Sequence, residues 1–254
     1  MGEPRIVTAA VLIIGNEILS GRTRDVNLAY LAAGLTELGI RLREARVVAD
    51  VEADIVRAVN ECRARYDYVF TTGGIGPTHD DITAECVAKA FAVPLIRNPE
   101  AVSRLERRYE PGTLNEARLR MANTPEDAVL IDNPVSTAPG FQIGNVFVLA
   151  GVPSIMQAMF DGLRTRLVGG APMLSRTVSA FVGEGTIALG LGELQQRYRD
   201  LDIGSYPFYR HGRYGASFVL RGTERARIDH AATELRTLII SLGADPIEGD
   251  PAER

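Results

Sequence analysis

The segment YVFTTGGIGPTHDDIT, residues 68–83, guides the interpretation of the whole chain. Its first residues, Tyr68 to Thr71, form an apolar run that predicts a buried strand. The three glycines that follow can adopt positive φ angles and let backbone N–H groups approach an anion closely. A helix predicted to begin near Asp80 to Thr83 adds unpaired N–H groups and the positive end of its dipole. The segment therefore predicts a phosphate-binding loop between a strand and a helix.

A simpler structure fits the same residues. A tight strand-to-helix turn also uses glycines, with Asp80 or Asp81 capping the helix. The loop lacks the lysine of a Walker motif and does not match the dinucleotide fingerprint. The hydroxyls of Thr72 and Thr78 can add donors for a phosphate, but these residues alone leave both interpretations open.

The chain around this segment alternates between strand and helix patterns. Because the order is β-α-β-α-β-α, the strands are expected to be parallel, joined by right-handed crossovers and covered by helices on both faces. Strands are predicted at 5–14, 41–48 and 68–71, and helices around 28–38, 55–62 and 87–91.

The remaining residues predict an extension of this sheet and then a second domain. Residues 98–121 are expected to be helical with an interruption at Pro111-Gly112, and short strands are expected at 129–131 and 141–150, followed by a helix to 167. Gly169 to Pro172 has the composition of a linker. Beyond it we expect a strand at 174–182, a helix at 189–198, strands at 203–209 and 215–221 around a turn at 210–213, and a helix at 228–242. We therefore predict an α/β domain over residues 1–170, with a three-layer and mostly parallel sheet, and a smaller α+β domain over 171–254.

Other polar loops follow the predicted strands. Gly15-Asn16-Glu17 follows the first strand, Asp50 the second, and Gly151 to Ser154 a later one. In a parallel sheet these loops emerge at the carboxyl edge, where open α/β folds bind ligands. Each has a simpler role available, because Glu17 can be solvated, Asp50 can cap a helix, and Pro153 can begin one.

Four carboxylates are predicted at this edge, on Glu17, Asp50, Asp80 and Asp81. They would repel a phosphate unless a divalent cation lay between them, and Mg²⁺ is the usual cation for oxygen ligands. Such a cation polarises phosphoryl oxygens and activates water, which indicates phosphoanhydride cleavage or transfer. His79 is assigned an orienting or surface role.

Composition excludes several classes of partner. The 254 residues carry 28 basic and 32 acidic side chains, a net charge of -4, which gives no field for nucleic acid or an anionic membrane. The apolar runs are too short to span a bilayer, and the N-terminal residues lack the pattern of a signal peptide. Cys62 and Cys86 fall on apolar helix faces, so we expect core packing in a reducing, cytoplasmic setting.

Several motifs of this chain resemble the molybdopterin-binding domain superfamily. Residues 71–83 match its central motif, and GNEILSG at 15–21 with Asn27 matches the opening of its competence/damage-inducible protein A branch. Later motifs of that branch match Asn133-Pro134-Val135, Ala138 to Phe141, Leu149 to Ser154, Gly183 to Gly185 and Gly204 to Pro207. The resemblance covers nearly the whole chain. One departure is Ala150, which stands where the branch has proline.

The resemblance implies a set of functions. Members of the branch are similar to metal-dependent ADP-ribose pyrophosphatases, domains fused to FAD synthase hydrolyse FAD, and other superfamily members adenylylate or bind molybdopterin. It implies catalytic roles for Asp50 and Asp81, a cation (Mg²⁺, Mn²⁺ or Co²⁺) shared with Glu17 and Asp80, and a homo-oligomer. Deamidation is not expected, because the branch's amidase domain has no match in this chain. The expected phosphate or nucleotide ligands are Thr72, Gly73, Gly74, Gly76, Thr78, Gly151 and Ser154. A molybdopterin adenylyltransferase and a non-catalytic module that binds a nucleotide or pterin phosphate remain alternatives.

Overall fold

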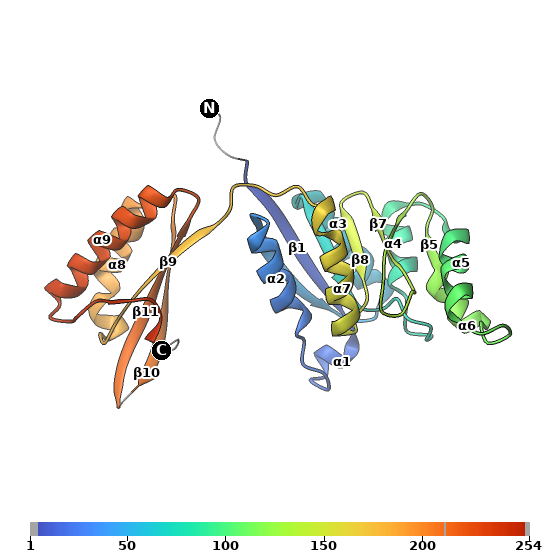
Figure 1. The fold of residues 1–254 in the computed structure, drawn as a ribbon, viewed down its shortest axis with the longest axis horizontal. Coiled ribbons are helices and arrows are strands. Elements are labelled where there is room, and N and C mark those ends of the chain that lie inside the picture. Colours follow the sequence, from blue (N-terminus) through green and yellow to red (C-terminus); the bar gives the residue numbers. More distant parts are fainter. Residues whose placement is uncertain (1–4, 211, 252–254) are drawn as a thin grey trace. The chain divides into compact units, whose positions relative to one another are not determined.

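The computed structural model describes residues 5–210 and 212–251. The chain forms two compact units, the first ending at Ala171 and the second beginning at Pro172, each with its own sheet and core (Figure 1). No helix in the described part is long and apolar enough to cross a lipid bilayer.

The first unit is built on a six-stranded, mostly parallel sheet. The strand order is β2-β1-β3-β8-β7-β6. The first four of these strands pair in parallel, whereas β7 is antiparallel to both β8 and β6. The predicted α/β class is therefore confirmed. The strands are β1 (Val7–Ile14), β2 (Ile40–Val48), β3 (Tyr68–Thr72), β6 (Val129–Ile131), β7 (Gly140–Ile143) and β8 (Val146–Leu149).

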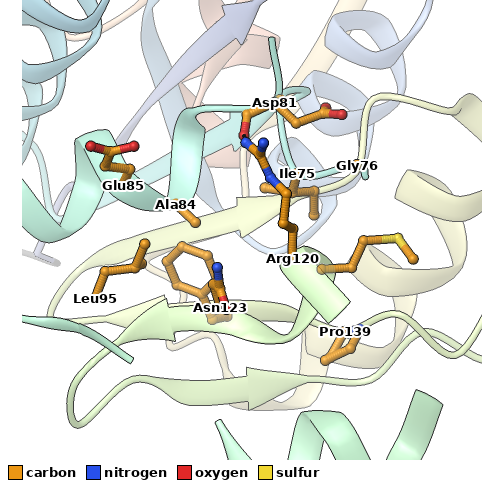
Figure 2. A pocket seen from close by; sticks show the side chains of 12 residues that line it. Ile75, Gly76, Asp81, Ala84, Glu85, Leu95, Arg120, Asn123 and Pro139 are labelled. Carbon is orange, nitrogen blue, oxygen red and sulfur yellow. Dashed lines mark hydrogen bonds between the residues drawn. The ribbon is translucent and has the colours of Figure 1, made fainter. Parts of the chain in front are cut away.

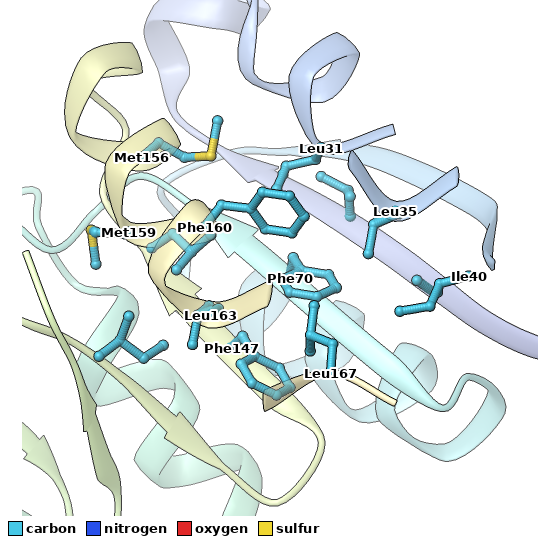
Figure 3. Packing of buried hydrophobic residues seen from close by; sticks show 14 of the residues in the cluster. Leu31, Leu35, Ile40, Phe70, Phe147, Met156, Met159, Phe160, Leu163 and Leu167 are labelled. Carbon is cyan, nitrogen blue, oxygen red and sulfur yellow. The ribbon is translucent and has the colours of Figure 1, made fainter. Parts of the chain in front are cut away.

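Helices cover both faces of this sheet. On one face, α2 (Asn27–Glu37) and α7 (Pro153–Leu163) pack over Phe70 and Phe147, whose rings stack at 5.2 Å between centroids (Figure 3). A Cβ on Gly34 of α2 would lie 2.4 Å from the Phe160 ring of α7, so glycine allows these helices to approach closely. On the other face, α3 (Glu52–Arg65) and α4 (Thr83–Phe91) bury a second cluster that contains both cysteines.

The segment between α4 and β6 adds a small layer beside the sheet. Strands β4 (Leu95–Arg97) and β5 (Asn123–Pro125) pair antiparallel, and β5 packs beside α4. Asn98 caps α5 by accepting hydrogen bonds from the N–H groups of Glu100 and Ala101. The short helices of this unit are α1 (Asn16–Leu19), α5 (Pro99–Arg108), α6 (Glu116–Leu119), η1 (Arg120–Ala122) and η2 (Arg164–Arg166).

The structure corrects one predicted strand. Residues 141–150 do not form one strand, because β7 and β8 are the two arms of a hairpin that turns at Gly144. Gly144 has φ +54°, a left-handed conformation that glycine adopts at little cost. The Asn145 side chain donates to the carbonyls of Arg63 and Tyr66, which fixes the turn against α3. The apolar residues on either side of the turn had masked it in the sequence pattern.

The second unit has an antiparallel sheet in the order β10-β11-β9-β12, with α8 (Glu184–Arg197) and α9 (Arg225–Ser241) packed on one face. Helix α8 begins at Glu184, five residues before the predicted start, and contains glycines that obscured it. A Cβ on Gly190 would lie 2.6 Å from Leu238 of α9, so this glycine permits close helix packing. The predicted turn at 210–213 includes His211, which lies outside the described residues. The strands are β9 (Leu174–Ala180), β10 (Asp202–Arg210), β11 (Arg213–Gly222) and β12 (Ile247–Glu248), the last of which was not predicted.

Candidate functional site

The glycines after β3 give the loop a shape that other residues cannot adopt. Gly73 has φ +100° and Gly74 has φ +67°. A Cβ would lie 2.2 Å from the carbonyl oxygen of Ile14 at the first position, and 2.1 Å from Oγ1 of Thr83 at the second. Hydrogen bonds hold the loop at both ends. At its start the Gly73 N–H donates to the Leu149 carbonyl, and at its end the Thr83 hydroxyl donates to the Gly73 carbonyl. This rigid turn holds the next residues of the loop at the carboxyl edge of the sheet.

The middle of the loop presents a series of backbone donors. In the described ranges 5–210 and 212–251, the N–H groups of Gly74, Ile75 and Gly76 donate to no backbone carbonyl. These residues are half-buried, and the start of α4 follows. Successive N–H groups in such a turn, together with a helix N-terminus, form a concave site for an anion.

Asp81 is held beside these donors by Thr78. One carboxylate oxygen, Oδ2, accepts from the Thr78 N–H at 2.7 Å and from the Thr78 hydroxyl at 2.5 Å. A Cβ on Gly76 would lie 2.6 Å from that oxygen, so the absence of a side chain there makes room for the carboxylate. The Thr78 hydroxyl also faces Asp80 and, with the Asp80 N–H, holds the pKa of the Asp80 carboxyl below its ordinary value.

The loop forms one wall of a pocket of about 260 Å³ (Figure 2). The opposite wall comes from the β4–β5 layer and β7, and it is mostly apolar. Arg120 reaches from that wall toward Asp81, and its guanidinium donates to the Asp81 carbonyl at 3.4 Å. Arg120 and Asn123 were not predicted as site residues. The lining residues are Gly74, Ile75, Gly76, Asp81, Ala84, Glu85, Leu95, Arg120, Met121, Asn123, Pro139 and Phe141.

A second, smaller pocket of about 60 Å³ adjoins the beginning of the loop. Gly73 and Gly151 meet there, since a Cβ on Gly151 would lie 3.2 Å from the Cα of Gly73. The pocket also contains polar side chains from α1, the following turn and α2, among them Glu17 and Asn27. We call it the polar pocket, and the larger one the loop pocket. The polar pocket is lined by Ile13, Ile14, Glu17, Ile18, Thr23, Arg24, Asp25, Val26, Asn27, Thr72, Gly73, Gly151 and Pro153.

The structure distributes the predicted glycines and hydroxyls between these pockets. Gly74 and Gly76 line the loop pocket, whereas Thr72, Gly73 and Gly151 line the polar pocket. Thr78 and Ser154 line neither of them, and Ser154 is exposed in the first turn of α7.

The predicted carboxylates are also spread out. Asp81 lies in the loop pocket and Glu17 in the polar pocket, while Asp80 is exposed. Asp50 lines neither pocket, and its Oδ2 accepts from the Asn16 N–H at 2.8 Å. Within the described residues, no three or more His, Cys, Asp or Glu side chains gather as a metal cluster, so these four carboxylates do not form a ready cage. His79 is 96% exposed in its side chain, which agrees with a surface role.

A mostly parallel sheet with a glycine loop, a helix N-terminus and a carboxylate at its carboxyl edge is typical of α/β domains that bind ligands at that edge. Residues 10–168 match the family described as "Probable molybdopterin binding domain", and residues 172–243 match "FAD synthase, middle domain". The chain belongs to the molybdopterin-binding-domain family.

Individual relatives agree with this assignment. A protein of Pyrobaculum calidifontis is 44% identical over 61% of this chain and 62% of its own. A "CinA-like protein" of Geotalea uraniireducens is 40% identical over 60% of this chain and 38% of its own. A "Probable FAD synthase" of Caenorhabditis elegans is 31% identical over 93% of this chain and 50% of its own. The chain thus spans less than two thirds of the length of each of these relatives.

Among solved structures, the CinA protein of Thermoplasma acidophilum, described as having unknown function, aligns with a TM-score of 0.60. It is 36% identical, and the alignment covers 63% of this chain and 98% of the other. The resemblance to competence/damage-inducible protein A is thereby confirmed.

Proposed function

We propose that this chain hydrolyses the phosphoanhydride bond of a nucleotide diphosphate of the ADP-ribose or FAD class, with the help of a divalent cation. The observation that carries the proposal is the placement of Asp81 and Arg120 at one pocket, beside the backbone N–H groups of Gly74 to Gly76, which donate to no backbone carbonyl of the described residues. The loop N–H groups and the Arg120 guanidinium can donate hydrogen bonds to phosphate oxygens. The Asp81 carboxylate beside them can bind a cation that is also held by the phosphates. The match to an FAD synthase domain and an FAD synthase relative supports a nucleotide as the substrate.

In this proposal the loop pocket takes one half of the substrate. The N–H groups of Gly74 to Gly76 hold the phosphate oxygens, and the Arg120 guanidinium offsets their charge. The apolar wall, which includes Leu95 and Phe141, packs against the ring system of the base. A free phosphate would leave this wall uncovered, so the pocket favours a nucleotide over inorganic phosphate.

The residues present fit a cation carried by the substrate. Mg²⁺ is commonly bound by one or two carboxylates together with substrate phosphates and water, and it does not require a protein cage. Both bonds from Thr78 end on Oδ2 of Asp81, which leaves Oδ1 of this carboxylate for a cation at the loop pocket. When bound, such a cation polarises the phosphoryl oxygens and lowers the pKa of bound water.

The protein groups then have separate tasks. The loop N–H groups orient the phosphate, and they stabilise negative charge that develops on its oxygens as water attacks. Thr78 keeps the Asp81 carboxylate in position. The apolar wall excludes water from the ring of the base.

The test is AMP release from ADP-ribose, FAD and NAD by the purified chain, with Mg²⁺, Mn²⁺ and Co²⁺ each in turn. We expect AMP only when a metal is present, and none from Asp81→Asn with an unchanged circular dichroism spectrum. Asp127→Asn is the matched control, because Asp127 is exposed, lines neither pocket and has φ +61°, which asparagine also tolerates. Full activity in folded Asp81→Asn would refute the role of this carboxylate.

A second function is favoured by the description of the matched family. A molybdopterin adenylyltransferase would use the same loop for phosphate and the apolar wall for a pterin or an adenine ring. Formation of adenylylated molybdopterin from ATP, without AMP release from any dinucleotide, would establish that reaction instead. Tight nucleotide binding with turnover in neither assay would identify a binding module.

A further inference from the structure

Asn27 carries a buried oxygen without a protein partner. The residue begins α2, is 5% exposed and lines the polar pocket. Its Nδ2 donates to the Gly151 carbonyl at 2.8 Å. In the described ranges its Oδ1 is buried and accepts no hydrogen bond. The orientation of the amide is fixed by chemistry, because only the NH₂ end can face the Gly151 carbonyl, so Oδ1 has to face elsewhere.

A buried carbonyl oxygen without a hydrogen-bond donor lowers the stability of the folded state. Leaving such an acceptor unsatisfied costs its full desolvation penalty, and buried polar groups in native proteins are rarely left without a partner. A ligand that brings an O–H or N–H group into the polar pocket would supply the missing donor. Asn27 therefore has the features of a recognition residue, which is anchored by its amide nitrogen and offers its oxygen to a ligand.

The polar pocket is placed to receive the far side of a diphosphate. It contains Gly73, while the loop pocket begins at Gly74, and consecutive Cα atoms are about 3.8 Å apart. A substrate whose phosphates lie on this loop can therefore extend into both pockets. The backbones of Gly73 and Gly151 come together here, because a Cβ on Gly151 would lie 3.2 Å from the Cα of Gly73, a tight contact.

Size and chemistry decide which half of the substrate belongs in the polar pocket. A buried water requires roughly 10–15 Å³, so about 60 Å³ holds a few hydroxyl-sized groups and is too small for an aromatic base. The lining offers Glu17, Thr23 and Asn27, and oxygen acceptors of this kind bind sugar hydroxyls, as carboxylates do in dinucleotide sites. The base consequently belongs in the loop pocket, and a polyhydroxylated group belongs in the polar pocket.

We infer that the polar pocket binds the hydroxyls of a ribose or ribityl group attached to the distal phosphate, with Oδ1 of Asn27 as an acceptor. The substrate is then a diphosphate substituted at both ends, and free nucleoside diphosphates and triphosphates are poor ligands. This inference rests on the phosphate loop of the proposed function. It adds Asn27 and the polar pocket as the groups that recognise the sugar of the substrate.

The experiment measures binding of two uncleavable ligands to the full chain by calorimetry in the presence of Mg²⁺. One ligand is ADP-ribose with a methylene group between its phosphorus atoms. The other has the same bridge and carries a tetrahydrofurfuryl group, which keeps the five-membered ring and lacks its three hydroxyls. The first should bind the wild-type chain about tenfold more tightly, because it satisfies the Asn27 oxygen.

Two variants separate recognition from structure. Asn27→Ala should bind both ligands with equal affinity, because it removes the oxygen acceptor that only the ligand with hydroxyls can use. The control is Asn98→Ala, which removes an asparagine from the start of α5, away from both pockets, and should leave the preference intact. If the role of Asn27 were purely structural, Asn27→Ala would lower the affinity for both ligands by the same factor.

Several results would overturn the inference. These are equal affinities in the wild-type chain, a preference that survives in Asn27→Ala, and no binding of either ligand. Failure of hydrolysis is a separate result, because it would refute the proposed reaction while the binding preference could still be observed with these uncleavable ligands.

Discussion

The carboxylate of Asp81 accepts two hydrogen bonds from Thr78, one from the backbone N–H and one from the hydroxyl, and both end on Oδ2. The two bonds fix the plane of the carboxylate and leave Oδ1 for a ligand. Thr78 lines neither pocket, so we assign it a positioning role that acts through Asp81. The site thus depends on contacts within the loop as well as on the groups that touch the substrate.

Replacing Thr78 by valine should test this positioning. Valine keeps the shape and the backbone N–H but removes the hydroxyl, so the Asp81 carboxylate becomes freer to rotate. We expect kcat/KM for AMP release to fall about tenfold, the effect typical of groups that orient a ligand-binding side chain. The midpoint of thermal unfolding should change little, because Thr78 is exposed. Thr36→Val on the surface of α2 is the control and should leave kcat/KM unchanged.

Gly76→Ala should be more damaging to activity. The added Cβ would lie 2.6 Å from Oδ2 of Asp81, so the carboxylate or the loop has to move. Displacement of a reacting group by about 1 Å can reduce the rate by about a hundredfold, and we expect a loss of this size in kcat/KM. Gly162→Ala, in α7, meets no atom within 4 Å and should stabilise the helix by about 1 kcal/mol without affecting the rate. Wild-type activity in Gly76→Ala would show that the position of Asp81 is unimportant.

The parallel part of the fold could be predicted from the sequence because its periodic patterns are long and local. Leu31 and Leu35 identify the buried face of α2, and Gly39 ends that helix with φ +72°. The hairpin of β7 and β8 could not be recognised in the same way. Gly144 lies within a run of apolar residues, and the turn is stabilised by bonds from Asn145 to α3, about eighty residues earlier in the sequence.

In the candidate site, too, the local features could be predicted from the sequence, and the contacts between distant segments could not. The glycine loop is a local feature, and the structure brings Gly74, Gly76 and Asp81 to one pocket. Arg120 reaches this pocket from a segment 39 residues further along the chain, and no local pattern marked it among the arginines of the predicted helical region. The unpaired oxygen of Asn27 depends on the position of Gly151, so only the folded chain reveals it.

The thiols of the first unit should be unreactive while it is folded. Burial, with a smaller contribution from nearby carboxylates, raises the pKa of the Cys86 thiol to about 12, and burial also raises the pKa of Cys62. The thiolate is the reactive form, and at pH 8 it would be roughly one part in ten thousand for Cys86. Iodoacetamide should therefore modify neither cysteine until urea unfolds the chain, as followed by mass spectrometry. Rapid alkylation of Cys86 in the native protein would contradict this.

Asp67 should make stability depend on pH below about pH 4. Burial alone would raise the pKa of its carboxyl, but hydrogen bonds from the Thr8 N–H and hydroxyl, with Arg5, outweigh burial and lower it from 3.8. A depressed pKa in the folded state adds stability above the unfolded value, and this stability is lost as pH falls through the folded value. The free energy of unfolding, measured with urea at pH 7 and at pH 3, should fall less between these pH values for Asp67→Asn than for the wild type. Equal losses would show that this carboxyl does not contribute.

Arg120→Gln should weaken substrate binding more than it slows the reaction. Arg120 lines the loop pocket, and within the described part of the chain its guanidinium donates one long hydrogen bond, to the Asp81 carbonyl, so it remains available to a phosphate. Losing a charged hydrogen bond costs about 1.5–3 kcal/mol, and because Arg120 is exposed, solvent screening reduces this cost, so we expect KM to rise about tenfold. The difference in KM between the variant and the wild type should become smaller as salt is added. Arg57→Gln, an exposed change on α3, should leave KM unaltered. If Arg120→Gln instead lowers kcat and kcat/KM equally with KM unchanged, the guanidinium acts only in the transition state, and its assignment to ground-state phosphate binding is wrong.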